Sequence, residues 1–215
     1  MIYGRRPVAE ARRGRRRVHR VWTSDDVPSA ELTRLAGSPD HQGVVAEVDP
    51  YRYGDPAALL ERPDALVVAL DQIQDPRNLG AVCRSAEAAG AAGVVIPTRR
   101  SAAVTAVACK ASAGAVEHLT VARVPNLADW LRLAKDAGAW VYGAALAARA
   151  SYDKADLSGK VVLVLGGEGT GLRRRVAEGC DLLISIPVQG RVTSLNVSAA
   201  AAVLLFEAAR QRGRG

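Results

Sequence analysis

The chain has 215 residues, of which 49% are hydrophobic and 24% charged, and it carries a formal net charge of +7 with a pI near 9.8. This length allows one large domain or one domain with a small appendage, and the hydrophobic content is ample for a buried core. No apolar run reaches membrane-spanning length and the start of the chain is basic, so the sequence predicts neither a membrane protein nor a secreted one.

The cysteines and histidines are scattered along the chain and lack the paired spacing of metal ligands. Isolated small thiols are typical of buried residues in a reducing compartment, so we expect a cytoplasmic protein with neither a disulfide framework nor a metal site. The residues concerned are Cys83, Cys109, Cys180, His19, His41 and His118.

Residues 1–60 are predicted to form a small separate unit. The pattern favours helices over 3–13 and 29–37 and strands over 17–22 and 43–53. The unit has too few apolar residues for a good core of its own, and Pro63 with Asp64 marks a boundary.

A basic cluster opens this unit. Residues 1–20 contain eight arginines and one acid, Glu10, so the remainder of the chain is nearly neutral. Such a cluster attracts phosphate backbones and makes binding salt-dependent. A solvated tail or a charged helix face explains it equally well. Since only 4% of residues are aromatic, any nucleic-acid contact should depend more on phosphates than on base stacking.

From residue 66 onward, apolar runs of strand length alternate with helical patterns. Alternation of this kind is typical of an α/β fold whose parallel sheet is covered on both faces. The predicted strands are 66–71, 93–97, 119–124, 140–146, 161–165 and 182–186, and the predicted helices are 79–89, 101–112, 126–137 and one starting near 197.

The polar loop after the first of these strands, DQIQDPRN (71–78), lies at a carboxyl strand end. Asn78 is well placed to cap the following helix. Arg84 shares one helix face with Ala81 and Ala88, so its side chain could reach across a cleft. Alternatively, Asn78 is only a helix cap and Arg84 is only a surface charge.

The last third of the chain, 161–211, holds the most informative pattern. A buried strand, VVLVL, runs into Gly166, Gly167, Gly169 and Gly171, which permit tight turning and close approach of a ligand. Ligands of open α/β sheets bind beyond the carboxyl ends of the strands, so we expect a backbone-lined pocket here, with two empty tight turns as the alternative.

The same region ends in a helix. Asn196 is expected to cap it, and its apolar residues recur at helical spacing on one face. Known nucleotide motifs fail at the glycine loop, because Leu172 and Arg173 stand where a phosphate-binding P-loop needs Lys and Ser or Thr. The apolar face comprises Val197, Ala200, Ala201, Leu204, Leu205 and Ala208.

Three segments carry a family resemblance. They are DPRNLGAVCRSAEAAG, LGGEGTGL and IPVQGRVTSLNVSAAAAVLLFEAARQR. In order and spacing they resemble the three motifs of the SpoU (TrmH- and RlmB-like) RNA 2′-O-ribose methyltransferases of the SPOUT superfamily. The resemblance covers a methyltransferase domain at 64–212.

The resemblance implies a parallel-sheet domain whose C-terminal part forms a trefoil knot that holds S-adenosylmethionine. It also implies a homodimer with the C-terminal helix in the interface, which the apolar face of that helix would suit. The implied catalytic residues are Asn78, Arg84, Glu168 and Asn196. The implied cofactor-binding residues are Leu165, Gly166, Gly167, Ile186, Val188, Ser194 and Leu195.

The first unit resembles the L30e-like RNA-binding domain of RlmB-type members, abridged over about 23–31. The segments GRRPVAEA and HQGVVAEV carry this similarity. It implies RNA as the partner of the basic cluster, through Arg5, Arg6, Arg12, Arg13, Arg15, Arg16 and Arg17.

The expected function is therefore S-adenosylmethionine-dependent methylation of an RNA ribose 2′-hydroxyl, with a guanosine of 23S rRNA as target and tRNA as the alternative. A catalytically weak RNA-binding relative and a small-molecule methyltransferase are the rival interpretations. The second should not need the arginine-rich first twenty residues.

Overall fold

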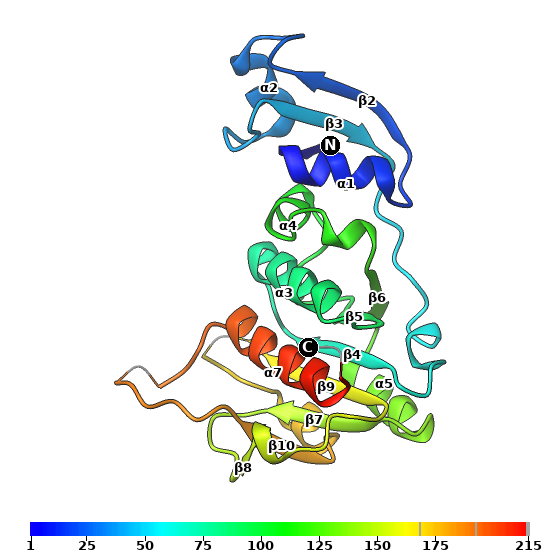
Figure 1. Ribbon diagram of the computed structural model, residues 1–215, viewed down its shortest axis with the longest axis vertical. Coiled ribbons are helices and arrows are strands. Elements are labelled where there is room, and N and C mark those ends of the chain that lie inside the picture. Colours follow the sequence, from blue (N-terminus) through cyan, green and yellow to red (C-terminus); the bar gives the residue numbers. More distant parts are fainter. Residues whose placement is uncertain (168, 192, 214–215) are drawn as a thin grey trace.

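The computed structural model describes residues 1–167, 169–191 and 193–213. Two sheets lie one above the other along the long axis of the molecule (Figure 1). The first 48 residues form an antiparallel three-stranded sheet with order β1-β3-β2, and the rest of the chain forms a parallel seven-stranded sheet with order β6-β5-β4-β9-β7-β10-β8.

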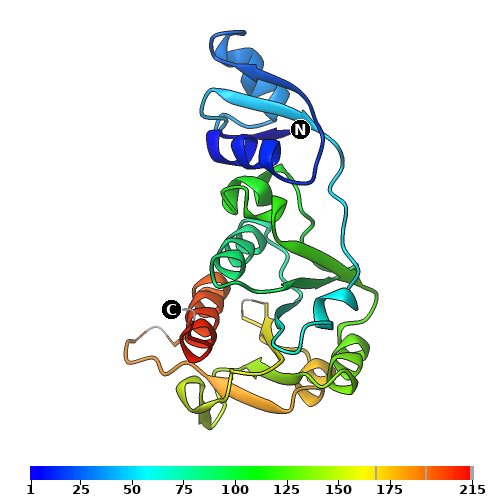
Figure 2. The same cartoon turned by 45° about the vertical axis from the view of Figure 1, so that its right-hand side comes forward.

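The N-terminal unit contains the two helices and two main strands predicted, together with a short additional strand, β1. Its elements are β1 (Ile2–Tyr3), α1 (Arg5–Arg13), β2 (Val18–Thr23), α2 (Ser29–Ala36) and β3 (Val44–Val48). An extended segment then runs down to the second sheet (Figure 2) and reaches the 3₁₀ turn η1 (Ala58–Leu60).

This unit depends on the rest of the chain for part of its core. Tyr3, Leu32 and Val45 form a small cluster of their own, whereas Ile2 and Val8 belong to the main core beneath. In the segment after β3, Leu59 and Leu60 already pack against the large sheet. Residues 1–60 contain few apolar residues, and the structure shows the consequence: the unit completes its core by packing against the domain of the large sheet.

The large sheet is parallel throughout, as predicted. Its strands are β4 (Leu66–Asp71), β5 (Gly93–Pro97), β6 (Thr120–Val124), β7 (Trp140–Ala144), β8 (Ala150–Ser151), β9 (Val161–Gly166) and β10 (Leu182–Ser185). The helical segments are α3 (Pro76–Ala88), α4 (Ala106–Ala111), η2 (Ala115–Glu117), α5 (Leu127–Asp136), η3 (Tyr152–Lys154), α6 (Arg174–Glu178) and α7 (Val197–Gln211).

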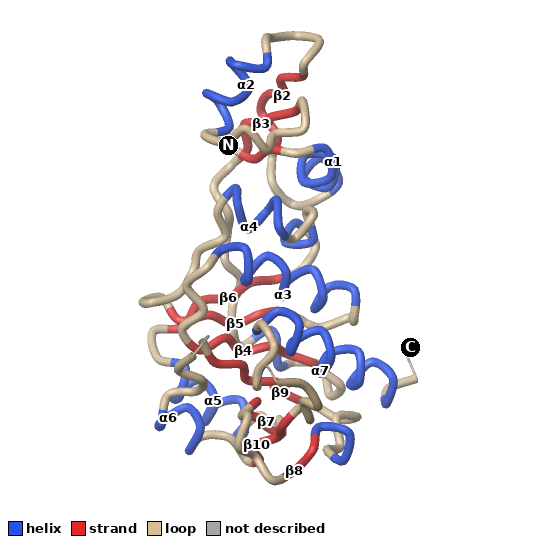
Figure 3. Tube along the Cα trace, turned by 90° about the vertical axis from the view of Figure 1, so that its left-hand side faces the viewer, coloured by secondary structure: helices blue, strands red, loops and turns tan. Residues whose placement is uncertain are grey.

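Two cores sandwich this sheet. Side chains alternate along each strand, so Val68 and Leu70 join the core with α3 and α7, while Val67 and Ala69 join the core with α5. Figure 3 shows the helices on both sides of the strands. The prediction of a sheet buried on both faces, made from apolar runs without alternation, is therefore confirmed.

One predicted helix is shorter than expected. α4 begins at Ala106, not at residue 101, with Thr105 as its N-cap. The preceding backbone hydrogen-bonds elsewhere, because Ala102 N donates to Ile73 O at 2.7 Å and Val104 N donates to Tyr53 Oη at 3.0 Å. These tertiary hydrogen bonds hold the segment in an extended form.

None of the helices in the described parts of the chain is long and apolar enough to cross a membrane.

Candidate active site

Two neighbouring strands bring the predicted site loops together. β4 and β9 pair in parallel, and their last residues, Asp71 and Gly166, stand opposite each other. The polar loop before α3 and the glycine loop after β9 therefore leave the sheet at the same edge, as the sequence indicated. This is the carboxyl edge, where ligands of such sheets bind.

The glycine loop folds back on itself so tightly that glycine is required. A Cβ built on Gly166 would stand 2.1 Å from the Gly171 carbonyl carbon. Gly169 and Gly171 have positive φ angles of 75° and 63°, which residues with a Cβ rarely adopt. Gly171 N donates to Gly167 O at 2.9 Å and closes the turn. Glu168, predicted as catalytic, lies outside the described residues.

An ion pair that sequence reasoning did not identify closes the base of this loop. The buried Asp71 carboxylate accepts the Arg173 backbone N–H at 2.8 Å and the Arg173 guanidinium at 2.8 and 2.7 Å. The sequence contained a signal for it, because a carboxylate ends a strand that is otherwise wholly apolar.

Asn78 and Asn196 meet although they are 118 residues apart. Asn196 Nδ2 donates to Asn78 Oδ1 at 3.1 Å. Asn196 Oδ1 accepts the Ser198 backbone N–H at 2.8 Å, so Asn196 caps α7 as predicted. The cap fixes which atom of the amide faces Asn78. Two of the predicted catalytic residues therefore form one amide pair, held by two helices.

The expectation that Asn78 caps α3 is wrong. The N-cap is Asp75, whose carboxylate accepts the Arg77 backbone N–H at 2.8 Å, and Pro76 follows it at the first helical position. Asp before Pro is a strong helix start. Asn78 lies within the first turn, and its side chain is directed to Asn196 instead of to its own backbone.

Arg84 lies farther along α3 than Asn78 and is exposed. Ala81 lies between them at helical spacing and lines a pocket of about 460 Å³ that also contains Asn78 and Asn196. Arg84 does not line that pocket. It lies about two turns from the amide pair along the same helix.

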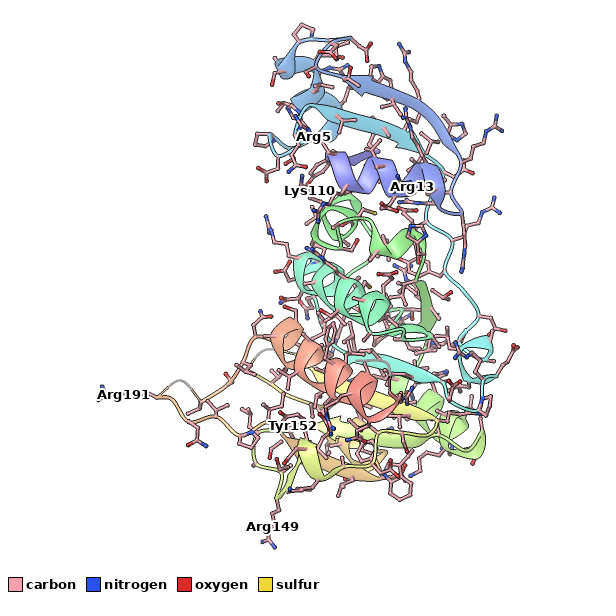
Figure 4. All side chains as sticks on the ribbon, in the orientation of Figure 1. Arg5, Arg13, Lys110, Arg149, Tyr152 and Arg191 are labelled. Carbon is pink, nitrogen blue, oxygen red and sulfur yellow. The ribbon has the colours of Figure 1, made fainter. Side chains whose placement is uncertain are left out.

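The predicted cofactor residues come from three segments. Leu165 and Gly166 end β9 and Gly167 follows it, and Ile186 packs partly against the main core just after β10. Val188, Ser194 and Leu195 are exposed on the segment between β10 and α7, part of which projects from the body at Arg191 (Figure 4).

The glycine loop suits a cofactor held by backbone atoms. Cβ atoms added at Gly169 and Gly171 would have no described residue within 4 Å. The main chain is thus uncovered on that side, and its polar groups can approach a ligand closely. This fits the small-residue cradle that S-adenosylmethionine would need.

Six of the seven predicted RNA-binding arginines are exposed, and the seventh is not. Arg5, Arg6, Arg12, Arg13, Arg15 and Arg17 lie on the surface. The Arg16 side chain is 9% exposed and pairs with the buried Glu117, with Arg16 Nε donating to Glu117 Oε2 at 2.8 Å. Because this guanidinium is already bound to a carboxylate, we leave Arg16 out of the RNA surface.

Two arginines outside the predicted RNA-binding set lie over aromatic rings. Arg20 stacks on Trp22, with 4.9 Å between the guanidinium carbon and the ring centroid, and lines a surface pocket with Arg12 and Arg17. Arg123 lies 3.8 Å above the ring of Tyr53. No cluster of three or more potential metal-ligating side chains occurs within 1–167, 169–191 and 193–213.

Comparison with known families identifies both parts of the chain. The SpoU rRNA Methylase family matches residues 65–206. A second family, RNA 2′-O ribose methyltransferase substrate binding, matches residues 25–54.

Curated relatives are longer than this chain. An uncharacterised tRNA/rRNA methyltransferase of Synechocystis is 37% identical over 241 residues, covering 99% of this chain and 63% of that protein. A protein of the same description from Mycolicibacterium vanbaalenii is 48% identical over 192 residues, covering 87% of this chain and 61% of that protein. The chain thus spans about three-fifths of their length.

Solved structures agree with these matches. The SpoU methyltransferase AviRb of Streptomyces viridochromogenes, in complex with AdoMet, is 28% identical with a TM-score of 0.81, over 100% of this chain and 90% of that chain. An AdoMet-bound rRNA methyltransferase of Sinorhizobium meliloti is 29% identical with a TM-score of 0.79, over 97% and 85%. The TrmH/SpoU tRNA modifying enzyme of A. aeolicus is 27% identical with a TM-score of 0.64, over only 74% and 80%.

The parallel sheet, the loops that meet at its carboxyl edge and a family match over more than half of the sequence lead to one assignment: this chain belongs to the SpoU rRNA methylase family.

Proposed function

We propose that this chain transfers the methyl group of S-adenosylmethionine to a ribose 2′-hydroxyl of RNA. The observation that carries the proposal is the convergence at one sheet edge of an uncovered glycine loop and the Asn78–Asn196 pair. The AdoMet complexes of two structural neighbours support the choice of cofactor. Leu165, Gly166, Gly167, Ile186, Val188, Ser194 and Leu195 would hold it.

The cofactor supplies an electrophilic methyl group on a sulfonium, so the protein must position the hydroxyl and help its proton leave. The amide pair fits the positioning role, because each amide has both donor and acceptor atoms and α7 fixes the orientation of Asn196. Arg84 is a permanent cation and fits the orientation of a nearby phosphate or hydroxyl better than the removal of a proton. Glu168 stays a predicted site residue.

We further propose that the substrate is rRNA and that the target is a guanosine of 23S rRNA. The protein would act in the cytoplasm. The rRNA methyltransferase of Sinorhizobium meliloti aligns with 97% of this chain, whereas the A. aeolicus tRNA modifying enzyme aligns with 74%. The match to an RNA substrate-binding family over 25–54 supports RNA contact by the N-terminal unit. tRNA remains the alternative substrate.

We also propose a homodimer, but through another face of α7 than the one predicted. The predicted apolar face is not available to a partner, because Val197, Ala201 and Leu204 are buried in the main core of the same chain. Ala199, Ala202, Val203 and Phe206 form a second stripe at helical spacing, and Phe206 is 51% exposed. An exposed apolar stripe supports pairing with another copy.

Mapping of ribose methylation in rRNA and tRNA from a strain that lacks this protein tests the proposal. We expect one rRNA ribose to lose its methyl group and to regain it on complementation. An unchanged rRNA pattern with one missing tRNA methyl group would reject the rRNA substrate but keep the reaction. Unchanged patterns in both RNAs would favour the small-molecule or weakly catalytic alternatives.

A further inference from the structure

A groove crosses the junction between the N-terminal unit and the candidate active site. It has a volume of about 460 Å³ and is lined from above by Tyr3 and Asp40 and from below by residues of α3, α4 and the start of α7. The lower residues are Arg77, Asn78, Ala81, Val107, Lys110, Ala111, Asn196 and Ser198. The groove therefore joins the Asn78–Asn196 pair to the unit that matches an RNA substrate-binding family.

Lys110 is the unusual residue of this groove. Its ammonium is buried and has no hydrogen-bond partner among the described residues. The other lysines all have partners: Lys135 pairs with Asp181 at 2.8 Å, Lys154 with Asp153 at 3.4 Å, and Lys160 donates to Ala137 O at 2.8 Å. Burial lowers the pKa of Lys110, and only the charge of Asp40 opposes that shift.

The position of Lys110 shows why it is hidden. Its side chain lies against Gly4, where an added Cβ would stand 2.6 Å from Nζ. Figure 4 shows Lys110 at the junction of α1 and α4, with Arg5 of the N-terminal unit nearby. A buried cation without a partner is costly. Rotation of the flexible lysine stem into the adjacent groove would let an anion there remove this cost.

The chemistry of the groove selects the anion. Arg77 and Lys110 provide two cations against the single carboxylate of Asp40, and the amides of Asn78 and Asn196 also line the groove. A phosphodiester needs a cation and polar donors in an open channel, without a tight apolar enclosure. The backbone of an RNA strand whose ribose lies at the amide pair meets these conditions.

We infer that this groove is a subsite for a backbone phosphate of the RNA strand, and that Lys110 binds this phosphate next to the methylated nucleotide. The inference rests on the proposed function and adds to it a positioning residue on α4, outside the segments that carry the family motifs. Phosphate binding there would link the N-terminal unit, α4 and the amide pair through one strand.

The test compares Lys110→Met with wild type for binding of a labelled RNA fragment that spans the nucleotide methylated by the wild-type protein. We expect the Kd for RNA to rise about tenfold, because a charge-assisted hydrogen bond is lost. The slope of log K against log salt should fall by about 0.7, the value for one phosphate contact on a single strand. Lys110→Arg, which keeps the cation, should restore most of the affinity.

Two controls separate phosphate binding from a structural role. Lys160→Met removes a lysine at the opposite edge of the sheet and should leave the Kd for RNA unchanged. Asp40→Asn removes the carboxylate that competes with the phosphate, so it should tighten RNA binding. If Lys110 only links the two units through Asp40, Asp40→Asn should weaken binding as Lys110→Met does.

Unchanged RNA affinity in Lys110→Met, loss of S-adenosylmethionine affinity in the same variant, or weaker binding in Asp40→Asn would overturn the subsite. Failure of the wild-type protein to methylate any RNA would instead reject the proposed function. The two failures are therefore distinguishable.

Discussion

Asp71 is buried beneath the candidate site and contacts Arg173. A fully buried carboxylate needs a charged or hydrogen-bonding partner, and here both come from the residue that follows the glycine loop. The loop is therefore anchored at its start by β9 and at its end by this ion pair. The anchor at its end is an ion pair that lies beneath the site.

We predict that Asp71→Asn weakens S-adenosylmethionine binding by up to about a hundredfold, since a hydrogen bond to a charged group is worth about 1.5–3 kcal/mol and this one holds the end of the glycine loop. The neutral amide cannot satisfy both the Arg173 N–H and the guanidinium. Calorimetric titration of the cofactor measures the effect.

The matched control is Asp181→Asn. Asp181 also accepts a backbone N–H, that of Val141 at 2.9 Å, and pairs with Lys135 at 2.8 Å, but it precedes β10 at the opposite edge of the sheet. It should lower stability without changing cofactor affinity. Equal losses of affinity in both variants would show that Asp71 only contributes to folding.

Arg84 gives a second prediction at this scale. Because its exposed side chain makes no hydrogen bond or ion pair within the described residues, Arg84→Ala should not disturb the fold. We expect methyl transfer to fall by about a hundredfold or more, as for loss of a preorganised electrostatic contact, with cofactor affinity intact. Single-turnover kinetics and calorimetry separate the two quantities, and lost cofactor affinity would make Arg84 structural.

Among the elements, α7 has two faces with different uses. One face is buried against α3 and β9, and the N-terminus of the helix holds Asn196 at the site. The stripe that contains Phe206 lies outside the main core. If this stripe forms the dimer interface, dimerisation would hold in place the helix that orients the amide pair.

We predict that Phe206→Asp shifts the protein from dimer to monomer, because burial of a charge in an apolar interface is costly. Light scattering after size-exclusion chromatography gives the mass. Leu133→Asp is the control, since Leu133 is 61% exposed on α5 and has no proposed partner. A Phe206→Asp variant with the mass of the wild-type protein would contradict the proposed interface.

Element type could be read from the sequence largely because local physics decides it. Buried parallel strands such as β4 and β9 are continuous apolar runs, and Asn196 has the position of a helix cap. The errors occurred where tertiary hydrogen bonds compete, as in the segment before α4, or where two capping residues are close, as for Asp75 and Asn78. The Asn78–Asn196 contact joins residues 118 apart, and no local pattern reports it.

At the scale of the whole molecule, a buried ion pair joins the N-terminal unit to the domain that contains the parallel sheet. Arg16 is wrapped by Glu117, by Cys109 at 3.4 Å and by the ring of Tyr51 at 5.6 Å. Nearby, Glu10 accepts a hydrogen bond from His118 at 2.9 Å, which lowers the pKa of Glu10. From the sequence alone, Arg16 was indistinguishable from its exposed neighbours, because only the fold places Glu117 beside it.

We predict that Glu117→Gln lowers the free energy of unfolding by about 3 kcal/mol, since it leaves a buried guanidinium without its counter-charge. The double variant Arg16→Met with Glu117→Leu should lie closer to wild type than either of its components, Arg16→Met alone and Glu117→Leu alone. Denaturant unfolding of wild type, these two single variants and the double variant gives the coupling energy, and a coupling near zero would contradict a stabilising ion pair.

The division into units at 1–60 and 64–212, the L30e-like character of the first unit and the trefoil knot stay predictions at this scale. A knot cannot be predicted from hydrophobic periodicity or composition, because these patterns report only local structure. The sequence resemblance is therefore their basis, and the parallel strand order is compatible with it.

The most direct measurement of the central claim is transfer of label from methyl-tritiated S-adenosylmethionine to unmodified rRNA and tRNA transcripts, followed by mapping of the labelled atom. We expect label on a single ribose 2′-oxygen, reduced to background by Asn78→Ala. Cofactor binding without label in any RNA, or label on a base instead of a ribose, would contradict it.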